Sequence, residues 1–263
     1  MTFILICYVT FYMVILMNGN ENEFNFVKAF NRKIVSDLDP LKKDLIMDLF
    51  NNVSETDEIT SWKNHYKQKT DVFIKIGVVT KRISIKLGSR NSVHLEHIDT
   101  FINFLKDNHV HQRAINIFLS YLYADGTINN TGLHRISAEE HRDSHKRDLI
   151  YLNKCFSDPQ LIIKVANRFV IKGLVYNDNI DALVYGTPND FLYIKQKDIF
   201  EIILRKADLF ILSPHFGPLV CQSMHRCLNR NEKYEYCRNY VQIKWYSLID
   251  DIIQQKYISH LFL

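Results

Sequence analysis

Glycine and proline are scarce in this chain of 263 residues, which contains 8 glycines and 5 prolines. Average protein sequences contain about 7% glycine and about 5% proline. Neither of the common glycine-rich phosphate-binding motifs, GxGxxG and GxxxxGK[ST], occurs in the sequence. The sequence therefore argues against nucleotide binding through a glycine-rich loop.

Cysteine shows the pattern of neither a disulfide framework nor a zinc site. The five cysteines are odd in number and form no CxxC pair, so we expect a reducing compartment and a cytoplasmic protein. Cys221, His225 and Cys227, with His215 nearby, match no standard zinc spacing. Buried structural residues are the favoured interpretation of this group.

The overall composition is that of an ordinary globular protein. Hydrophobic residues make up 47% of the chain and charged residues 24%, which excludes a disordered or fibrous protein. The 33 basic and 29 acidic residues give a net charge of +4. This mild excess is compatible with a nucleic-acid partner without requiring one.

The segment 1–17 differs from the rest because residues 2–17 contain no charged side chain. It is shorter than the roughly 20 residues that a membrane-spanning helix needs, and it lacks the basic start and cleavage site of a signal peptide. Three interpretations stay open: a membrane anchor, a buried element of the core, or residues translated upstream of a true start at Met17. We expect no membrane association unless the segment is a genuine anchor.

Hydrophobic periodicity predicts an α/β protein with a mixed β-sheet flanked by helices. No linker divides the chain clearly, and we expect a core over 18–130 and a C-terminal α+β region, 131–263, that completes the fold or binds substrate. The clearest feature is a β-hairpin turning around Thr80-Lys81. The predicted elements are helices at 21–34, 40–50, 93–106, 111–123, 137–153 and 198–206, and strands at 72–79, 82–87 and within 168–185.

Acidic and basic residues of the hairpin region form a candidate phosphodiester-cleaving site. Asp71 precedes the first hairpin strand, and Ser84 and Lys86 share one face of the second because strand residues alternate. Glu96 lies in the first turns of the next predicted helix, and Glu23 borders the apolar face of the first helix. Phosphodiester hydrolysis uses carboxylates to hold a divalent cation and a lysine to orient the attacking water and offset developing charge.

These residues resemble the motif of the PD-(D/E)xK nucleases, also called restriction-endonuclease-like proteins. Asp71 matches the family's aspartate, Lys86 its lysine and Glu23 the glutamate of its first helix. Ser84 stands where the family has its second acidic residue; some members carry that acid on the following helix, where Glu96 is expected. The resemblance covers residues 21–106, less than half of the chain.

The resemblance implies a restriction-endonuclease-like core and an endonuclease that cleaves DNA with Mg²⁺ or Mn²⁺, such as a restriction or phage-defence enzyme. It implies that Asp71 and Glu96 bind the metal. Without a second acid, the alternative is a nuclease-fold module that binds nucleic acid or a protein partner without cleaving it. A homodimer stays open. The catalytic residues implied are Glu23, Asp71, Ser84, Lys86 and Glu96.

Two segments are candidates for phosphate contacts. The loop Ser89-Arg90-Asn91-Ser92 offers backbone N–H groups, hydroxyls and a guanidinium beside the expected helix. The C-terminal Arg238 and Lys244 lie among aromatic residues, a combination that suits a nucleic-acid backbone. A solvated turn and a partly buried amphipathic segment are the respective alternatives. A rival copy of the catalytic spacing, Asp181 with Tyr193-Ile-Lys195, lacks a ligand at the tyrosine.

Overall fold

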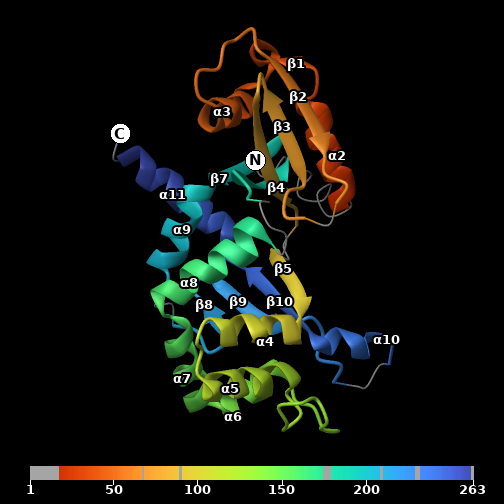
Figure 1. Cartoon of the computed structure of the whole chain (residues 1–263), viewed down its shortest axis with the longest axis vertical. Coiled ribbons are helices and arrows are strands. Elements are labelled where there is room, and N and C mark those ends of the chain that lie inside the picture. Colours follow the sequence, from red (N-terminus) through yellow and green to blue (C-terminus); the bar gives the residue numbers. More distant parts are fainter. Residues whose placement is uncertain are drawn as a thin grey trace, which may run out of the picture. The chain divides into compact units, whose positions relative to one another are not determined.

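The computed structural model describes residues 18–66, 68–88, 91–173, 179–207, 210–228 and 232–261. The apolar segment 1–17, whose role the sequence leaves open, lies outside these residues. The chain forms two compact units (Figure 1). The first unit comprises Met1–Asn91, Ile171–Ile199 and Leu248–Leu263, and the second comprises Ser92–Val170 and Phe200–Ser247. This division differs from the expected boundary near residue 130.

A six-stranded mixed sheet forms the centre of the first unit, in the order β1-β2-β3-β4-β6-β7. Neighbouring strands of this sheet run antiparallel, except β4 and β6, which run parallel to each other. A parallel pair needs a long crossover connection, and here the connection contains residues 92–170 of the second unit. The strands are β1 (Lys33–Ile34), β2 (Glu58–Lys63), β3 (Val72–Ile76), β4 (Val79–Lys86), β6 (Ala182–Thr187) and β7 (Asp190–Lys195).

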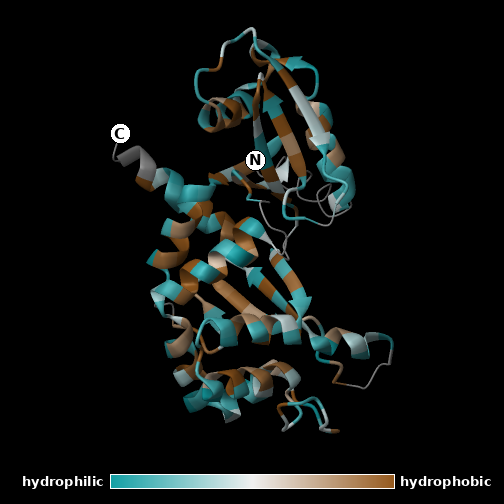
Figure 2. Ribbon diagram, viewed as in Figure 1, coloured by the Kyte–Doolittle hydropathy of each residue, from teal (hydrophilic) through white to brown (hydrophobic). Residues whose placement is uncertain are grey.

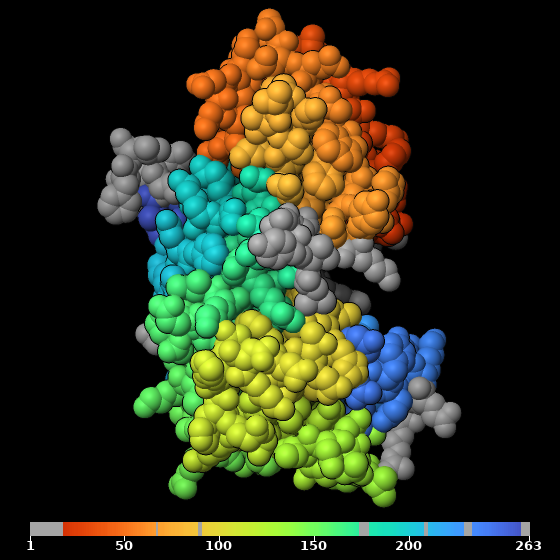
Figure 3. Space-filling view, viewed as in Figure 1, coloured from red at the N-terminus to blue at the C-terminus, as the bar shows by residue number. Residues whose placement is uncertain are grey.

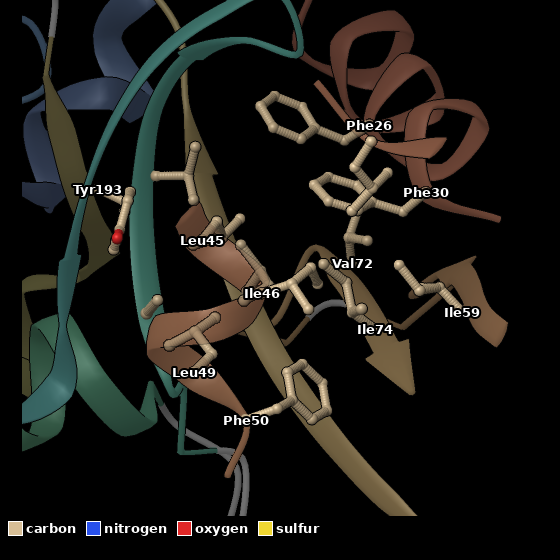
Figure 4. Close-up of a cluster of buried hydrophobic side chains, with 14 of the residues drawn as sticks. Phe26, Phe30, Leu45, Ile46, Leu49, Phe50, Ile59, Val72, Ile74 and Tyr193 are labelled. Atoms are coloured by element: carbon tan, nitrogen blue, oxygen red, sulfur yellow. The ribbon is translucent and has the colours of Figure 1, made fainter. Parts of the chain in front are cut away.

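Two helices cover one face of this sheet, α2 (Gly19–Phe30) and α3 (Pro40–Leu49). Figure 4 shows Phe26 and Phe30 of α2 and Leu45 of α3 beside strand residues such as Val72. The expected alternation is confirmed, because the buried residues of β3 and β4 in this core are Val72, Ile74, Ile76, Ile83 and Ile85. Ser84 and Lys86 therefore belong to the opposite face of β4.

The predicted hairpin is present as β3 and β4, but it turns earlier than expected. Ile76 pairs with Val79, so the turn consists of Gly77 and Val78 rather than Thr80-Lys81. Gly77 has a φ of 56°, in the left-handed region that glycine adopts without strain. Val78 is 95% exposed, and the light orange segment that contains the hairpin reaches the surface of the first unit in Figure 3.

The second unit contains a four-stranded antiparallel sheet in the order β5-β10-β9-β8. Its first strand corrects the sequence analysis, because residues predicted to open a helix at 93 form β5, and the helix α4 begins at Ile98. Pairing with the distant strand β10 holds β5 extended. The strands are β5 (Ser92–His97), β8 (His215–Phe216), β9 (Leu219–Ser223) and β10 (Tyr240–Trp245).

Helices make up most of the remaining described chain, and hydrophobic and hydrophilic residues interleave along them (Figure 2). The capping box of Ser137 and Glu140 is confirmed, although the helix expected to reach 153 divides at His145. Of the strands expected within 168–185, the described start forms η2 instead, residues 174–178 lie outside the described ranges, and the end forms β6 from Ala182. The elements are η1 (Val35–Asp37), α4 (Ile98–Asp107), α5 (Gln112–Tyr123), α6 (Ala138–Ser144), α7 (Lys146–Phe156), α8 (Pro159–Ala166), η2 (Asn167–Lys172), α9 (Gln196–Arg205), α10 (Glu232–Glu235), η3 (Tyr236–Asn239) and α11 (Leu248–Leu261).

None of the helices in the described ranges has both the length and the apolar character that crossing a membrane requires. The sheets and helices together make this a mixed α/β protein with a mixed sheet flanked by helices. The chain after residue 130 completes the first sheet, since it supplies β6 and β7. It also supplies three of the four strands of the second sheet.

Candidate active site

The open end of the hairpin brings three of the predicted residues together. The backbone N–H of Asp71 donates to Ile83 O, which places the aspartate beside the middle of β4. The Asp71 Oδ2 atom accepts hydrogen bonds from Ser84 Oγ at 3.1 Å and from the backbone N–H of Ile85 at 2.6 Å. The carboxylate is therefore held in one orientation by the neighbouring strand.

Lys86 adds a positive charge to this cluster. Its Nζ lies 3.8 Å from Asp71 Oδ2 and donates to Ile85 O at 3.2 Å. The side chains of Lys86 and Asp71 are 20% and 21% exposed, whereas Ser84 is fully buried. The lysine and aspartate can thus meet a ligand from solvent, while the serine acts by fixing the aspartate.

Tyr185 is a neighbour of the cluster that the sequence analysis missed. It lies opposite Lys86 in the parallel β4–β6 register, and its hydroxyl donates to Gly88 O at 3.1 Å. Burial raises the pKa of this phenol above its ordinary value, so the hydroxyl stays protonated. No local pattern could have indicated Tyr185, because the pairing joins segments about 100 residues apart in the chain.

Glu23 occupies a different face of the sheet from the Asp71 cluster. Its carboxylate forms an ion pair of 2.8 Å with Lys63 Nζ. Lys63 is on β2 and, by alternation from the buried Ile59, belongs to the face that α2 covers. Ser84 and Lys86 belong to the other face, so the prediction that Glu23 joins them is not supported by the geometry of the first unit.

Glu96 is the largest correction to the predicted site. It lies on strand β5 of the second unit rather than in a helix, and its side chain is 2% exposed. Its Oε2 atom accepts a 3.0 Å hydrogen bond from Arg168 Nη2 and lies 3.5 Å from His94 Nε2. A buried carboxylate with an arginine partner in its own unit is engaged in holding β5 and η2 together.

The donor set for a divalent cation is correspondingly small. Within the described ranges, no group of three or more histidine, cysteine, aspartate or glutamate side chains is placed to hold a metal ion. Asp71 Oδ1 accepts no hydrogen bond from a described residue, whereas Oδ2 is engaged. Mg²⁺ is often bound by one or two carboxylates together with substrate phosphate oxygens and water. Asp71 therefore fits a cation that binds together with a phosphate substrate.

The loop proposed to contact phosphates is placed only in part. Ser89 and Arg90 lie outside the described residues. Asn91 is buried, and Ser92 begins β5, where its Oγ accepts a 3.2 Å hydrogen bond from Gln242 Nε2. A strand follows the loop, so the expected helix N-terminus beside it is wrong.

Arg238 is a second correction, because it is not a surface residue. It is completely buried, with Nη2 donating to Tyr123 O at 2.9 Å and to Asp125 Oδ2 at 3.2 Å. Its Nη1 donates to Glu235 Oε1 at 3.3 Å. Lys244 is only partly buried, and its Nζ lies 5.5 Å from the ring centroid of Tyr246. Lys244 alone of the two stays a candidate for phosphate contact.

Comparison of the chain with models of protein families finds no match, and comparison with curated proteins finds none.

A buried histidine of the second unit gives the fold a pH dependence. Burial lowers the pKa of His141 from 6.5 to about 4, with a further contribution from His145, whose ring stacks on it at 4.1 Å. Between pH 6.5 and 4 the unfolded chain binds the proton that the folded protein excludes. We expect the contribution of His141 to the free energy of unfolding to be at its maximum above pH 6.5. The free energy of unfolding should fall by about 1–2 kcal/mol from pH 7 to 5.

Urea unfolding at both pH values measures this effect. His141→Gln should reduce the change in the free energy of unfolding between the two pH values, even if the variant is less stable at both. His134→Gln, at an exposed position, should keep the wild-type change. An unaltered slope in His141→Gln would contradict the assignment.

Proposed function

We propose that the Asp71–Ser84–Lys86 cluster of the first unit is the active site of a metal-dependent endonuclease that hydrolyses DNA phosphodiester bonds. The observation that carries the proposal is the approach of Lys86 Nζ to within 3.8 Å of Asp71 Oδ2, with Ser84 holding the same oxygen. Asp71 directly precedes β3, and Ser84 and Lys86 lie on the paired strand β4 and share one of its faces. The proposal keeps Asp71, Ser84 and Lys86 from the predicted set and omits Glu23 and Glu96.

Each residue of the cluster has a distinct role in this proposal. Asp71 presents Oδ1 to Mg²⁺ or Mn²⁺, while Ser84 Oγ and the Ile85 N–H fix the orientation of the carboxylate. The bound cation would polarise the phosphate and lower the pKa of the attacking water. The Lys86 ammonium orients that water and offsets the charge that develops on the phosphorane.

The fold of the first unit supports the restriction-endonuclease-like interpretation. A helix, α2, precedes an antiparallel hairpin, with the aspartate directly before the first strand and the S-x-K sequence in the second, as the resemblance implies. A DNA-cleaving restriction or defence enzyme is the occupation that this resemblance suggests. Fold alone does not determine activity, so cleavage must be measured directly.

The test is nicking of supercoiled plasmid DNA by the full chain with Mg²⁺ or Mn²⁺, against EDTA. Cleavage should require the cation and be lost in Asp71→Asn. Asp181→Asn is the matched control, since Asp181 also precedes a sheet strand but accepts from Arg82 N–H and Lys81 Nζ. Equal nicking by wild type and Asp71→Asn, or loss only in Asp181→Asn, would overturn the proposal.

A second candidate function is a module that binds nucleic acid or a protein partner without cleaving it. Two observations favour it: Ser84 replaces the acid of the motif, and the carboxylate of Glu96 is paired with Arg168. This alternative predicts that the protein slows the migration of DNA in gel-shift experiments but does not nick it with either Mg²⁺ or Mn²⁺.

A further inference from the structure

The second unit contains a cavity of about 290 Å³ where helices α5 and α6 meet strand β9. Its walls include Tyr121 of α5, Arg142 of α6 and Gln222 of β9, together with Ser213, Arg226 and Tyr246. All of these residues belong to the second unit. None of them belongs to the Asp71 cluster, whose residues are part of the first unit.

Arg226 is a partly buried arginine whose guanidinium has an incomplete set of partners. Its Nη1 donates to Tyr121 O at 2.9 Å, and the guanidinium carbon lies 4.7 Å from the centroid of the Tyr121 ring. Its Nη2 is buried and has no hydrogen-bond partner. Burial lowers the pKa of Arg226, which shows that the site penalises its charge.

Arg142 increases the positive charge at the same cavity. Its Nη1 contacts Ser213 Oγ at 3.5 Å, and its charge also lowers the pKa of Arg226. Among the described residues, no carboxylate forms an ion pair with either of the two arginines. The contrast within this unit is clear, because the buried Arg135 and Arg238 are both paired with Glu235.

Two adjacent guanidiniums without a carboxylate are electrostatically costly, and an anionic ligand would compensate them. Guanidiniums bind phosphate through paired N–H groups. Ser213 and Gln222 add polar groups, and the Tyr246 hydroxyl already donates to Gln222 Oε1 at 2.8 Å. Tyr246 is 53% exposed, which leaves an aromatic surface on which a base can stack.

We propose that this cavity is a binding site for a nucleotide phosphomonoester, with the phosphate held by Arg142 and Arg226 and the base against Tyr246. The volume is at the lower end of the range for small-molecule sites, which suits one nucleotide rather than a larger ligand. The same chemistry is offered by a mononucleotide and by the 5′-phosphorylated end of a strand. The proposal does not depend on cleavage at Asp71.

Isothermal titration of the full chain with thymidine monophosphate, thymidine and inorganic phosphate tests the site. We expect the monophosphate to bind, thymidine to fail and inorganic phosphate to bind more weakly. Short oligonucleotides with a 5′-phosphate or a 5′-hydroxyl then separate the two sources: a preference for the phosphorylated strand identifies a strand end, and failure of both strands to bind identifies the mononucleotide. Equal binding of both strands would contradict recognition of the phosphomonoester. Failure of the monophosphate to bind at millimolar concentration would overturn the proposal.

Arg142→Gln should weaken binding of the monophosphate at least about tenfold, because it removes a charge-assisted contact. Arg113→Gln is the matched control, since Arg113 is an exposed arginine of the same unit whose partner is Asp148. Asp71→Asn should bind the monophosphate as the wild type does, which separates this site from the proposed nuclease site. Equal loss in both arginine variants would point to general charge and would contradict the assignment.

Discussion

Replacing Lys86 with alanine is expected to reduce plasmid nicking by at least about a hundredfold, because one preorganised charge at a reacting phosphate has an effect of that size. The Nζ atom that is lost lies 3.8 Å from Asp71 Oδ2. The side chain is 20% exposed and makes no contribution to the hydrophobic core. The rate should therefore fall while the free energy of unfolding changes little, which plasmid nicking and urea unfolding of the same preparation measure together.

The matched control for Lys86→Ala is Lys81→Ala on the same strand. Lys81 is also a partly exposed lysine with an aspartate partner, since its Nζ lies 3.2 Å from Asp181 Oδ1. It should keep nearly all of the nicking activity. Comparable loss in the two variants would mean that the effect is a general one of charge on DNA binding, and Lys86 would then have no special role.

The sequence was sufficient for the parts of the site that depend on neighbouring residues. The alternation of Ile83 and Ile85 with Ser84 and Lys86 follows from strand geometry alone, and so does their separation onto two faces. The register of the hairpin is not predicted correctly: a turn at Thr80-Lys81 would put Ser84 opposite Gly77, whereas the observed turn puts Asp71 beside Ser84. The turn was misplaced because Gly77 was not recognised as the residue that adopts a positive φ.

The parts that failed depend on contacts between distant segments. Residues 93–97 have an apolar pattern compatible with a helix, but their pairing with β10 makes them a strand. Glu96 therefore lies on a strand and not on the expected helix. The parallel pairing of β4 with β6 is likewise invisible in local periodicity, and it is what brings Tyr185 beside Lys86. A basic, aromatic composition also could not show that Arg238 is enclosed by Asp125 and Glu235.

Replacing Arg238 with alanine is expected to lower the free energy of unfolding by about 3–5 kcal/mol, the usual result of removing one partner of a buried ion pair. Arg238 is completely buried, and its loss would leave the Asp125 carboxylate and Tyr123 O without the donors they now have from Nη2. Asp125 also accepts hydrogen bonds from the Thr127 N–H and hydroxyl. Urea unfolding at pH 7 measures the change, and Lys244→Ala should cost less than about 1 kcal/mol.

A double variant distinguishes the loss of an ion pair from the loss of packing. Asp125→Asn removes the negative charge and keeps the size of the side chain. If the cost of Arg238→Ala comes from an uncompensated carboxylate, adding it to Asp125→Asn should cost clearly less than the sum of the two single changes. Strict additivity would contradict the ion-pair explanation and would attribute the stabilisation to the packing of the arginine stem. A combined cost below the sum would also show that the charge of Arg238 serves the fold rather than a nucleic-acid surface.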